Sequence, residues 1–90
     1  MIVARKFVIG GRVQGVGFRM FVEAAAVREG VHGYVHNLED GSVEALVEGD
    51  QAAVDRVELA LRRGPSGARV DSFDVEPAAA SYRPTGFHIR

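Results

Sequence analysis

The sequence predicts an α+β fold in which two helices pack on one face of an antiparallel sheet. Apolar residues alternate with period two in five stretches and recur at helical spacing in two others. The predicted order is βαββαβ with an extra C-terminal strand. The candidate strands are short and carry one apolar face each, so both helices should cover the same side of the sheet. A chain of 90 residues has room for one such domain, spanning residues 1–90.

The first strand and the first helix are separated by a glycine-rich stretch. One face of the strand carries Val3, Phe7 and Ile9. Arg5 interrupts this pattern and is expected at an exposed end of the strand, which Gly10–Gly11 should terminate. The helix has apolar residues at positions i, i+3, i+4 and i+7, which are Phe18, Phe21, Val22 and Ala25. Gly30 is the expected helix stop.

The middle of the chain predicts a β-hairpin. Residues 31–38 alternate between two faces, the first with Val31, Gly33, Val35 and Asn37 and the second with His32, Tyr34, His36 and Leu38. Asp40–Gly41 is typical of a hairpin turn. The inner face of the returning strand carries Val43, Ala45 and Val47. Asp50 is then the expected N-cap of the second helix.

The last third of the chain predicts one helix and two strands. The apolar stripe of the helix consists of Val54, Val57 and Leu61. Gly64–Pro65 should end this helix, and Phe73 and Val75 share one face of a fourth strand. Residues 77–84 are expected to form a loop, and residues 85–90 a short last strand.

This element order predicts the ferredoxin-like arrangement. A right-handed crossover makes the first two strands parallel, with the third strand between them. The C-terminal ends of the first two strands then lie at the same edge of the sheet. The glycine-rich stretch leaves one of these ends and Asn37 lies near the other, on the alternating face that Val35 shares. We therefore expect Arg19 and Asn37 to face one shared site.

The stretch from Gly11 to Arg19, here called the glycine loop, has the features of an oxyanion site. Its glycines allow unusual backbone conformations, and it runs into a helix whose first amides lack intrahelical partners. Arg19 adds a planar fork of donors with fixed charge, which matches phosphate oxygens. The spacing fits neither a nucleotide-binding P-loop nor the Gly-x-Gly-x-x-Gly motif of dinucleotide sites.

The exact residues of two stretches resemble a known family. The glycine loop reads Gly-Arg-Val-Gln-Gly-Val-Gly-Phe-Arg and is similar, position for position, to the phosphate-binding signature of the acylphosphatase family. The stretch from Gly33 to Glu44 resembles the other signature of that family, and Gly86 to Arg90 looks like its C-terminal ending. Tyr34 and His36 depart from the family pattern, which often has a tryptophan and a basic residue at these positions.

The resemblance implies hydrolysis of the carboxyl–phosphate bond of acyl phosphates, without a metal or another cofactor. It implies that Arg19 and Asn37 are catalytic, with Arg19 binding the phosphate and Asn37 orienting a water molecule. The amides expected to hold the phosphate belong to Gly15, Val16, Gly17, Phe18, Arg19 and Met20. In some members of the family the chain end approaches the catalytic arginine, so Arg90 could contact Arg19 here.

Composition excludes several other classes of function. The chain has no cysteine, which excludes disulfides, thiolate catalysis and cysteine-bound zinc. Eleven basic and twelve acidic residues give a net charge of −1, which disfavours a nucleic acid or a membrane as partner. No leader and no long apolar run is apparent. We expect a cytoplasmic monomer whose partner is a small-molecule acyl phosphate.

Three other interpretations were weighed. An RNA-binding module is disfavoured because its consensus must lie on a strand, whereas residues 15–22 cross into a helical pattern. A metal pair of His32 and His36 is disfavoured because this spacing on a strand separates the side chains by about 13 Å. The nearest rival is a non-catalytic domain that binds an acyl or carbamoyl phosphate for a partner.

Overall fold

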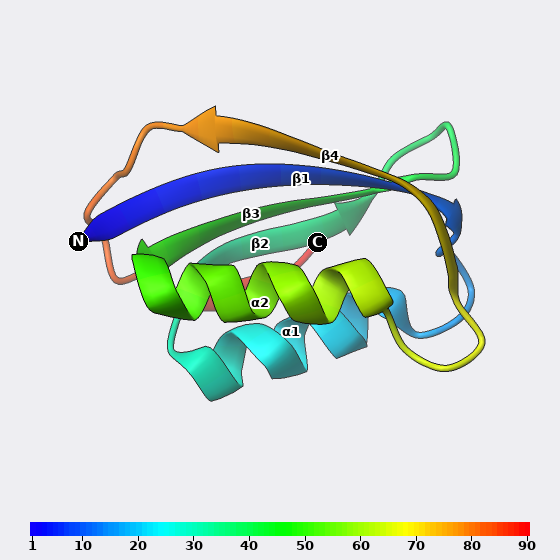
Figure 1. Ribbon diagram of the computed structural model, residues 1–90, viewed down its shortest axis with the longest axis horizontal. Helices are drawn as coiled ribbons and strands as arrows, with labels where there is room; N and C mark the ends of the chain where they lie inside the picture. Colours follow the sequence, from blue (N-terminus) through cyan, green and yellow to red (C-terminus); the bar gives the residue numbers. More distant parts are fainter.

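The computed structural model describes residues 1–90 and contains the predicted elements in the predicted order. The elements are β1 (Ile2–Arg12), α1 (Phe18–Glu29), β2 (His32–Asn37), β3 (Val43–Asp50), α2 (Gln51–Arg63), β4 (Arg69–Ala78) and β5 (Phe87–Ile89). The strands form one sheet in the order β4-β1-β3-β2-β5. Figure 1 shows α1 and α2 side by side on one face of this sheet, which confirms the predicted two-layer arrangement. Neither helix is long and apolar enough to cross a membrane.

The sheet is mostly antiparallel, as predicted, with one parallel pair of strands at its edge. β1 pairs antiparallel with β3 and β4, and β2 pairs antiparallel with β3, but β5 runs parallel to β2. The reason is the path of the chain after β4. Its connection stays at the end of the sheet where β2 begins, seen at the left of Figure 1, so β5 must run in the same direction as β2.

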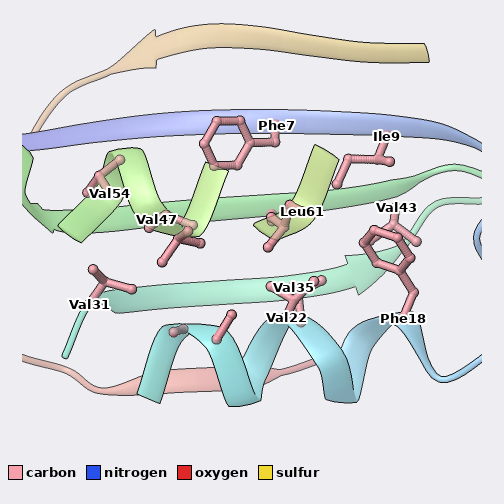
Figure 2. Packing of buried hydrophobic residues seen from close by; sticks show 14 of the residues in the cluster. Phe7, Ile9, Phe18, Val22, Val31, Val35, Val43, Val47, Val54 and Leu61 are labelled. Carbon is pink, nitrogen blue, oxygen red and sulfur yellow. The ribbon is translucent and has the colours of Figure 1, made fainter. Parts of the chain in front are cut away.

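One apolar core lies between the helices and the sheet (Figure 2). The predicted helix stripes and strand faces supply it, and its largest fully buried side chains include Phe7, Ile9, Phe18, Val22, Val35, Val43, Val47, Val54, Val57 and Leu61. At about 1.5 to 3 kcal/mol for each buried large apolar side chain, this cluster is the main source of stability. Figure 2 shows Phe18 at the start of α1 pointing toward the sheet. The helix end that follows the glycine loop is therefore held by the core.

Arg5 does not lie at an exposed strand end, as the sequence suggested. It faces the helices, because it shares the alternating face of Phe7, and its guanidinium reaches two carboxylates of α2. Nη1 of Arg5 donates to Oδ1 of Asp55 at 2.7 Å and to Oε1 of Glu58 at 3.1 Å. The predicted interruption of the apolar face is thus a paired charge that joins β1 to α2.

The strand β1 also continues past Gly10–Gly11, where the sequence analysis ended it. Its pairing with β4 shifts register between Gly10 and Gly11 and then continues to Arg12, which makes this position a β-bulge. Gly11 has φ +124°, and an added Cβ would lie 2.1 Å from the carbonyl oxygen of Arg69. The extra residue of this bulge is Asp71 of β4, and glycine at position 11 lets the main chain of β4 approach β1 closely where the glycine loop begins.

Candidate active site

The glycine loop is held at both ends by buried side chains and is open between them. Val13 and Phe18 are each 1% exposed, whereas Gly15 and Gly17 are exposed. These two glycines have φ of +74° and +77°, and an added Cβ at either would meet no atom within 4 Å. The backbone conformation, not crowding, therefore requires glycine here, and the space above the loop is free for a ligand.

The amides of the loop meet the start of α1 without protein acceptors. Gly17 is the N-cap, no side chain caps the helix, and the first helical hydrogen bond runs from Phe21 N–H to the Gly17 carbonyl at 3.0 Å. None of the amides from Gly15 to Met20 donates to a protein acceptor in the structure. Together with the positive end of the helix dipole, this row of donors can bind an oxyanion.

Arg19 is the second residue of α1 and is half-buried. Its Nη1 donates to the main-chain oxygen of Arg90 at 2.9 Å. The amide of Arg90 in turn donates to the carbonyl of Val35 in β2 at 2.9 Å. The contact between Arg19 and Arg90 is the one that the C-terminal resemblance suggested, and it attaches the guanidinium to the edge of the sheet beside β2.

Asn37 is the last residue of β2 and is exposed. It pairs with Val43 in the β2–β3 ladder, and it keeps the alternating phase of Val31 and Val35, both of which are buried as predicted. Its place on that face and its exposure at the strand end are compatible, because the sheet and the core both end there. The side chain of Asn37 makes no hydrogen bond to protein.

Gln14 is the residue that sequence analysis missed. Its Nε2 donates to the carbonyl of Leu38 at 2.8 Å and to the carbonyl of Ser42 at 2.9 Å. These two carbonyls belong to the β2–β3 hairpin, directly after Asn37. The long side chain of Gln14 thus ties the glycine loop to the turn. The available signal was an amide side chain within a stretch, residues 13–17, that otherwise consists of glycine and valine.

The hairpin turn is stabilised from within. Oδ1 of Asp40 accepts from the amide of Ser42 at 2.9 Å and from its hydroxyl, and these hydrogen bonds hold the pKa of Asp40 below its usual range. The amide of Leu38 donates to the carbonyl of Ser42 at 2.8 Å. The carbonyl of Ser42 therefore accepts from both Leu38 and Gln14, which makes it the point where the loop and the turn meet.

Tyr34 and His36, the departures from the family pattern, lie on the outer face of the sheet. Both contact Oε2 of Glu44, Tyr34 through its hydroxyl at 3.1 Å and His36 through Nε2 at 2.7 Å. The hydrogen bond with His36 is the main reason that the pKa of Glu44 is lowered. Nδ1 of His32 instead accepts a hydrogen bond from the amide of Gly86, so the two histidines have different partners.

Comparisons with known proteins agree on one family. A family model described as Acylphosphatase matches residues 5–89. An acylphosphatase of Koribacter versatilis is 45% identical over 85 residues, which make up 94% of this chain and 77% of that relative. The crystal structure of acylphosphatase from Bacillus subtilis superposes with a TM-score of 0.93 at 33% identity and covers 100% of this chain and 99% of that one.

A larger protein contains a similar domain. The crystal structure of HypF from T. kodakarensis matches 100% of this chain with a TM-score of 0.84 at 30% identity, but the match covers only 12% of the HypF chain. The same fold thus occurs both as a short chain and as a part of a long one. The match of the family model over residues 5–89, with relatives matched over 77% and 99% of their own length, shows that this chain belongs to the acylphosphatase family.

Proposed function

We propose that the protein hydrolyses acyl phosphates with the glycine loop and Arg19 as the phosphate site and Asn37 as the residue that orients the attacking water. The activity follows from the family, and the assignment of residues rests on the site. One observation carries this assignment. Two side chains of the loop are attached to the main chain on either side of Asn37: Gln14 to Leu38 directly, and Arg19 through Arg90 to Val35.

The first task of the site is to bind and neutralise the phosphate. The amides from Gly15 to Met20 supply neutral donors, and the guanidinium of Arg19 supplies the positive charge. One Nη of Arg19 is used by Arg90, which leaves the remaining donors for phosphate oxygens. This division of the guanidinium restricts its orientation before substrate arrives, so less side-chain entropy is lost on binding.

The second task is to place the water. The amide side chain of Asn37 can accept a hydrogen bond from the water and donate another to the phosphate. As the water oxygen forms its bond to phosphorus, the bond from phosphorus to the carboxylate oxygen breaks and the carboxylate leaves with the electron pair. A proton of the water passes to a phosphate oxygen. A carboxylate is a good leaving group, so no strong general acid is required.

The proposed mechanism uses no metal, because Arg19 and the amides supply the charge stabilisation that a cation provides in other phosphoryl transfers.

We further propose that residues 1–90 act as one domain, as a monomer in the cytoplasm, on a small-molecule substrate and without nucleic acid. Size-exclusion chromatography with light scattering tests whether the protein is a monomer. A measured mass of twice 9.7 kDa or more would contradict the monomer.

The test is hydrolysis of benzoyl phosphate, followed by ultraviolet absorbance with a chelator present. Arg19→Ala and Asn37→Ala should each lose about 10²- to 10³-fold in kcat, as expected when a donor that stabilises developing charge is removed. Arg28→Ala is the matched control for the arginine, since it lies in the last turn of the same helix, and Gln51→Ala is the control for the amide. Both controls should keep wild-type rates.

Two results would contradict the proposal. Wild-type turnover that stops with the chelator would overturn the metal-free mechanism. A wild type that binds phosphate but hydrolyses no acyl phosphate would favour the alternative, a domain that binds an acyl or carbamoyl phosphate for a partner.

A further inference from the structure

Glu48 is a buried carboxylate at the end of the sheet opposite the glycine loop. It belongs to the outer face of β3, and only 7% of its surface is exposed. Three donors of the connection between β4 and β5 surround it. Its Oε1 accepts from the amide and the hydroxyl of Ser81 at 3.0 and 2.9 Å, and its Oε2 accepts from the amide of Tyr82 at 2.6 Å.

Apart from its contacts with Glu48, the clamped connection, residues 79–86, makes hydrogen bonds to β2 only at Gly86. It contains no helix or strand, and most of its residues are exposed. Tyr82 has φ +57°, and it is the one residue other than glycine with a positive φ. The residue is 74% exposed, so packing of its side chain does not explain this conformation. The hydrogen bond from the Tyr82 amide to Glu48 provides the compensating interaction.

From this clamp the chain runs to Arg90, which contacts Arg19. Gly86 is next held by β2, since its amide donates to Nδ1 of His32 and its carbonyl accepts from the amide of Gly33, both at 2.9 Å. β5 then adds three residues parallel to β2, and Arg90 presents its main-chain oxygen to Arg19. Figure 1 shows this path from the left end of the molecule to the C-terminus.

Three parallel residue pairs are a weak attachment by themselves, because short two-stranded pairing is marginal in water. Loop residues 79–85, if free to move, would cost the β5 pairing much of its stability through backbone entropy. A buried carboxylate is also expensive unless its oxygens are hydrogen-bonded. The position of β5, and with it the oxygen that receives Arg19, therefore depends on an anchor in the connection.

We propose that Glu48 is a positioning residue for phosphoryl transfer: its carboxylate fixes the Ser81–Tyr82 turn, which fixes β5 and Arg90 and thereby orients the guanidinium of Arg19. This inference rests on the proposed function of Arg19. Glu48 itself does not touch the substrate. It acts on the reaction through the main chain of the C-terminal segment, residues 79–90.

The decisive experiment combines kinetics with amide hydrogen exchange on the full chain. Glu48→Gln keeps the shape of the side chain but replaces one acceptor by a donor that faces the amide donors of the turn. We expect exchange at the amides of Gly33 and Arg90 to become at least about tenfold faster, while exchange at the core amides of α1, α2 and β3 changes by a clearly smaller factor. Ser81→Ala removes one donor outside the sheet and should change the same amides by less.

The kinetic readout separates positioning from stability. With Arg19 less well oriented, KM for benzoyl phosphate and the inhibition constant of inorganic phosphate should rise, and kcat should fall. The combined loss in kcat/KM should be about tenfold, less than the 10²-fold that a 1 Å misplacement at a reacting centre can cost. Glu76→Gln is the matched control, because Glu76 lies on the exposed outer face of β4 and pairs only with Lys6. It should leave both readouts unchanged.

Two outcomes would overturn the role of Glu48. One is faster exchange at Gly33 and Arg90 with unchanged KM and kcat, because the clamp would then serve stability alone. The other is lower activity with exchange accelerated by the same factor across the whole core and at Gly33 and Arg90, because global destabilisation would then explain both effects. A different result would contradict the proposed function: a wild type that does not hydrolyse benzoyl phosphate and whose hydrogen exchange does not change when inorganic phosphate is added.

Discussion

Polar groups at the two ends of the sheet differ in whether they have hydrogen-bond partners within the protein. At the end with the glycine loop, the amides from Gly15 to Met20 and the side chain of Asn37 have no protein partner. At the other end, the buried carboxylate of Glu48 accepts three hydrogen bonds and is fully engaged. Buried or converging polar groups usually find partners within the protein, so a group of unpaired donors marks the place where a ligand is expected.

The difference also shows how the free donors are kept in position. The open end is supported indirectly, by a buried ring below it and by two side-chain contacts at its borders. Phe18 lies under the loop, Gln14 ties it to the hairpin and Arg90 receives Arg19. The closed end supplies one of those supports through the C-terminal segment. Substitutions at each support measure how much the open end depends on it.

The largest effect is expected from the ring below the loop. Phe18→Ala should lower the free energy of unfolding by about 3 to 5 kcal/mol, because it leaves a cavity at a position that is 1% exposed. Urea unfolding followed by circular dichroism measures this change. Met20→Ala, two residues further and 70% exposed, is the control and should stay within about 0.5 kcal/mol of wild type. Equal effects at both positions would show that the loop does not depend on the core.

The next effect concerns the fork of donors at Arg19. Arg19→Lys keeps the charge but loses the planar guanidinium, so it cannot serve Arg90 and the phosphate together. We expect kcat for benzoyl phosphate to fall by about 10²-fold, with an unchanged urea midpoint. A lysine variant with near wild-type kcat would mean that positive charge alone is sufficient, and the contact with Arg90 would then have no catalytic importance.

A third, smaller effect is expected at Gln14. Gln14→Met keeps the length of the side chain but removes both hydrogen bonds to the hairpin. Loss of the tether should reduce kcat/KM by about tenfold and stability by about 1 to 2 kcal/mol. The readouts are benzoyl phosphate kinetics and urea unfolding. Gln51→Met is the control, since Gln51 is exposed at the start of α2. A Gln14 variant with wild-type kinetics would contradict the tether.

Features set by local pattern were predicted from the sequence, whereas contacts between distant residues were not. Glycine and apolar spacing predicted the elements, the core and the meeting of the glycine loop with the end of β2, because each depends on periodicity or on strand order. The partners of Arg5, Gln14 and Glu48 were not predicted. Each reaches residues 24 to 53 positions away in the chain, and such contacts depend on the assembled sheet and not on local pattern.

The parallel pairing of β5 was missed for a related reason. Strand patterns indicate which residues alternate, but the direction of a terminal strand depends on where the preceding connection crosses the sheet. Here that crossing is determined by Glu48 and His32, which bind residues 81, 82 and 86. The resemblance of Gly86–Arg90 to the family ending suggested the contact with Arg19, although it did not indicate how the segment reaches it.

The smallest expected effect is a loss of stability in acid that centres on the closed end. Hydrogen bonds from the amide of Ser81 are the main reason that the pKa of Glu48 is lowered, and His36 has the same effect on Glu44. A carboxyl group with a lowered pKa takes up its proton at higher pH in the unfolded chain than in the folded one. The unfolded state therefore binds more protons, and stability falls as pH drops through and below the ordinary range of glutamate, about pH 4.3.

Urea midpoints measured between pH 7 and pH 3 test this dependence. Wild type should lose stability steadily below about pH 4.5, and Glu48→Gln should be less stable at pH 7 but show a flatter curve. The protection of the Arg90 amide, measured relative to the intrinsic exchange rate at each pH, should fall over the same interval in wild type, because protonation of Glu48 releases the turn that holds β5. If the curves of the two proteins are parallel, Glu48 does not contribute to the acid dependence, and the C-terminal segment is held by β2 alone.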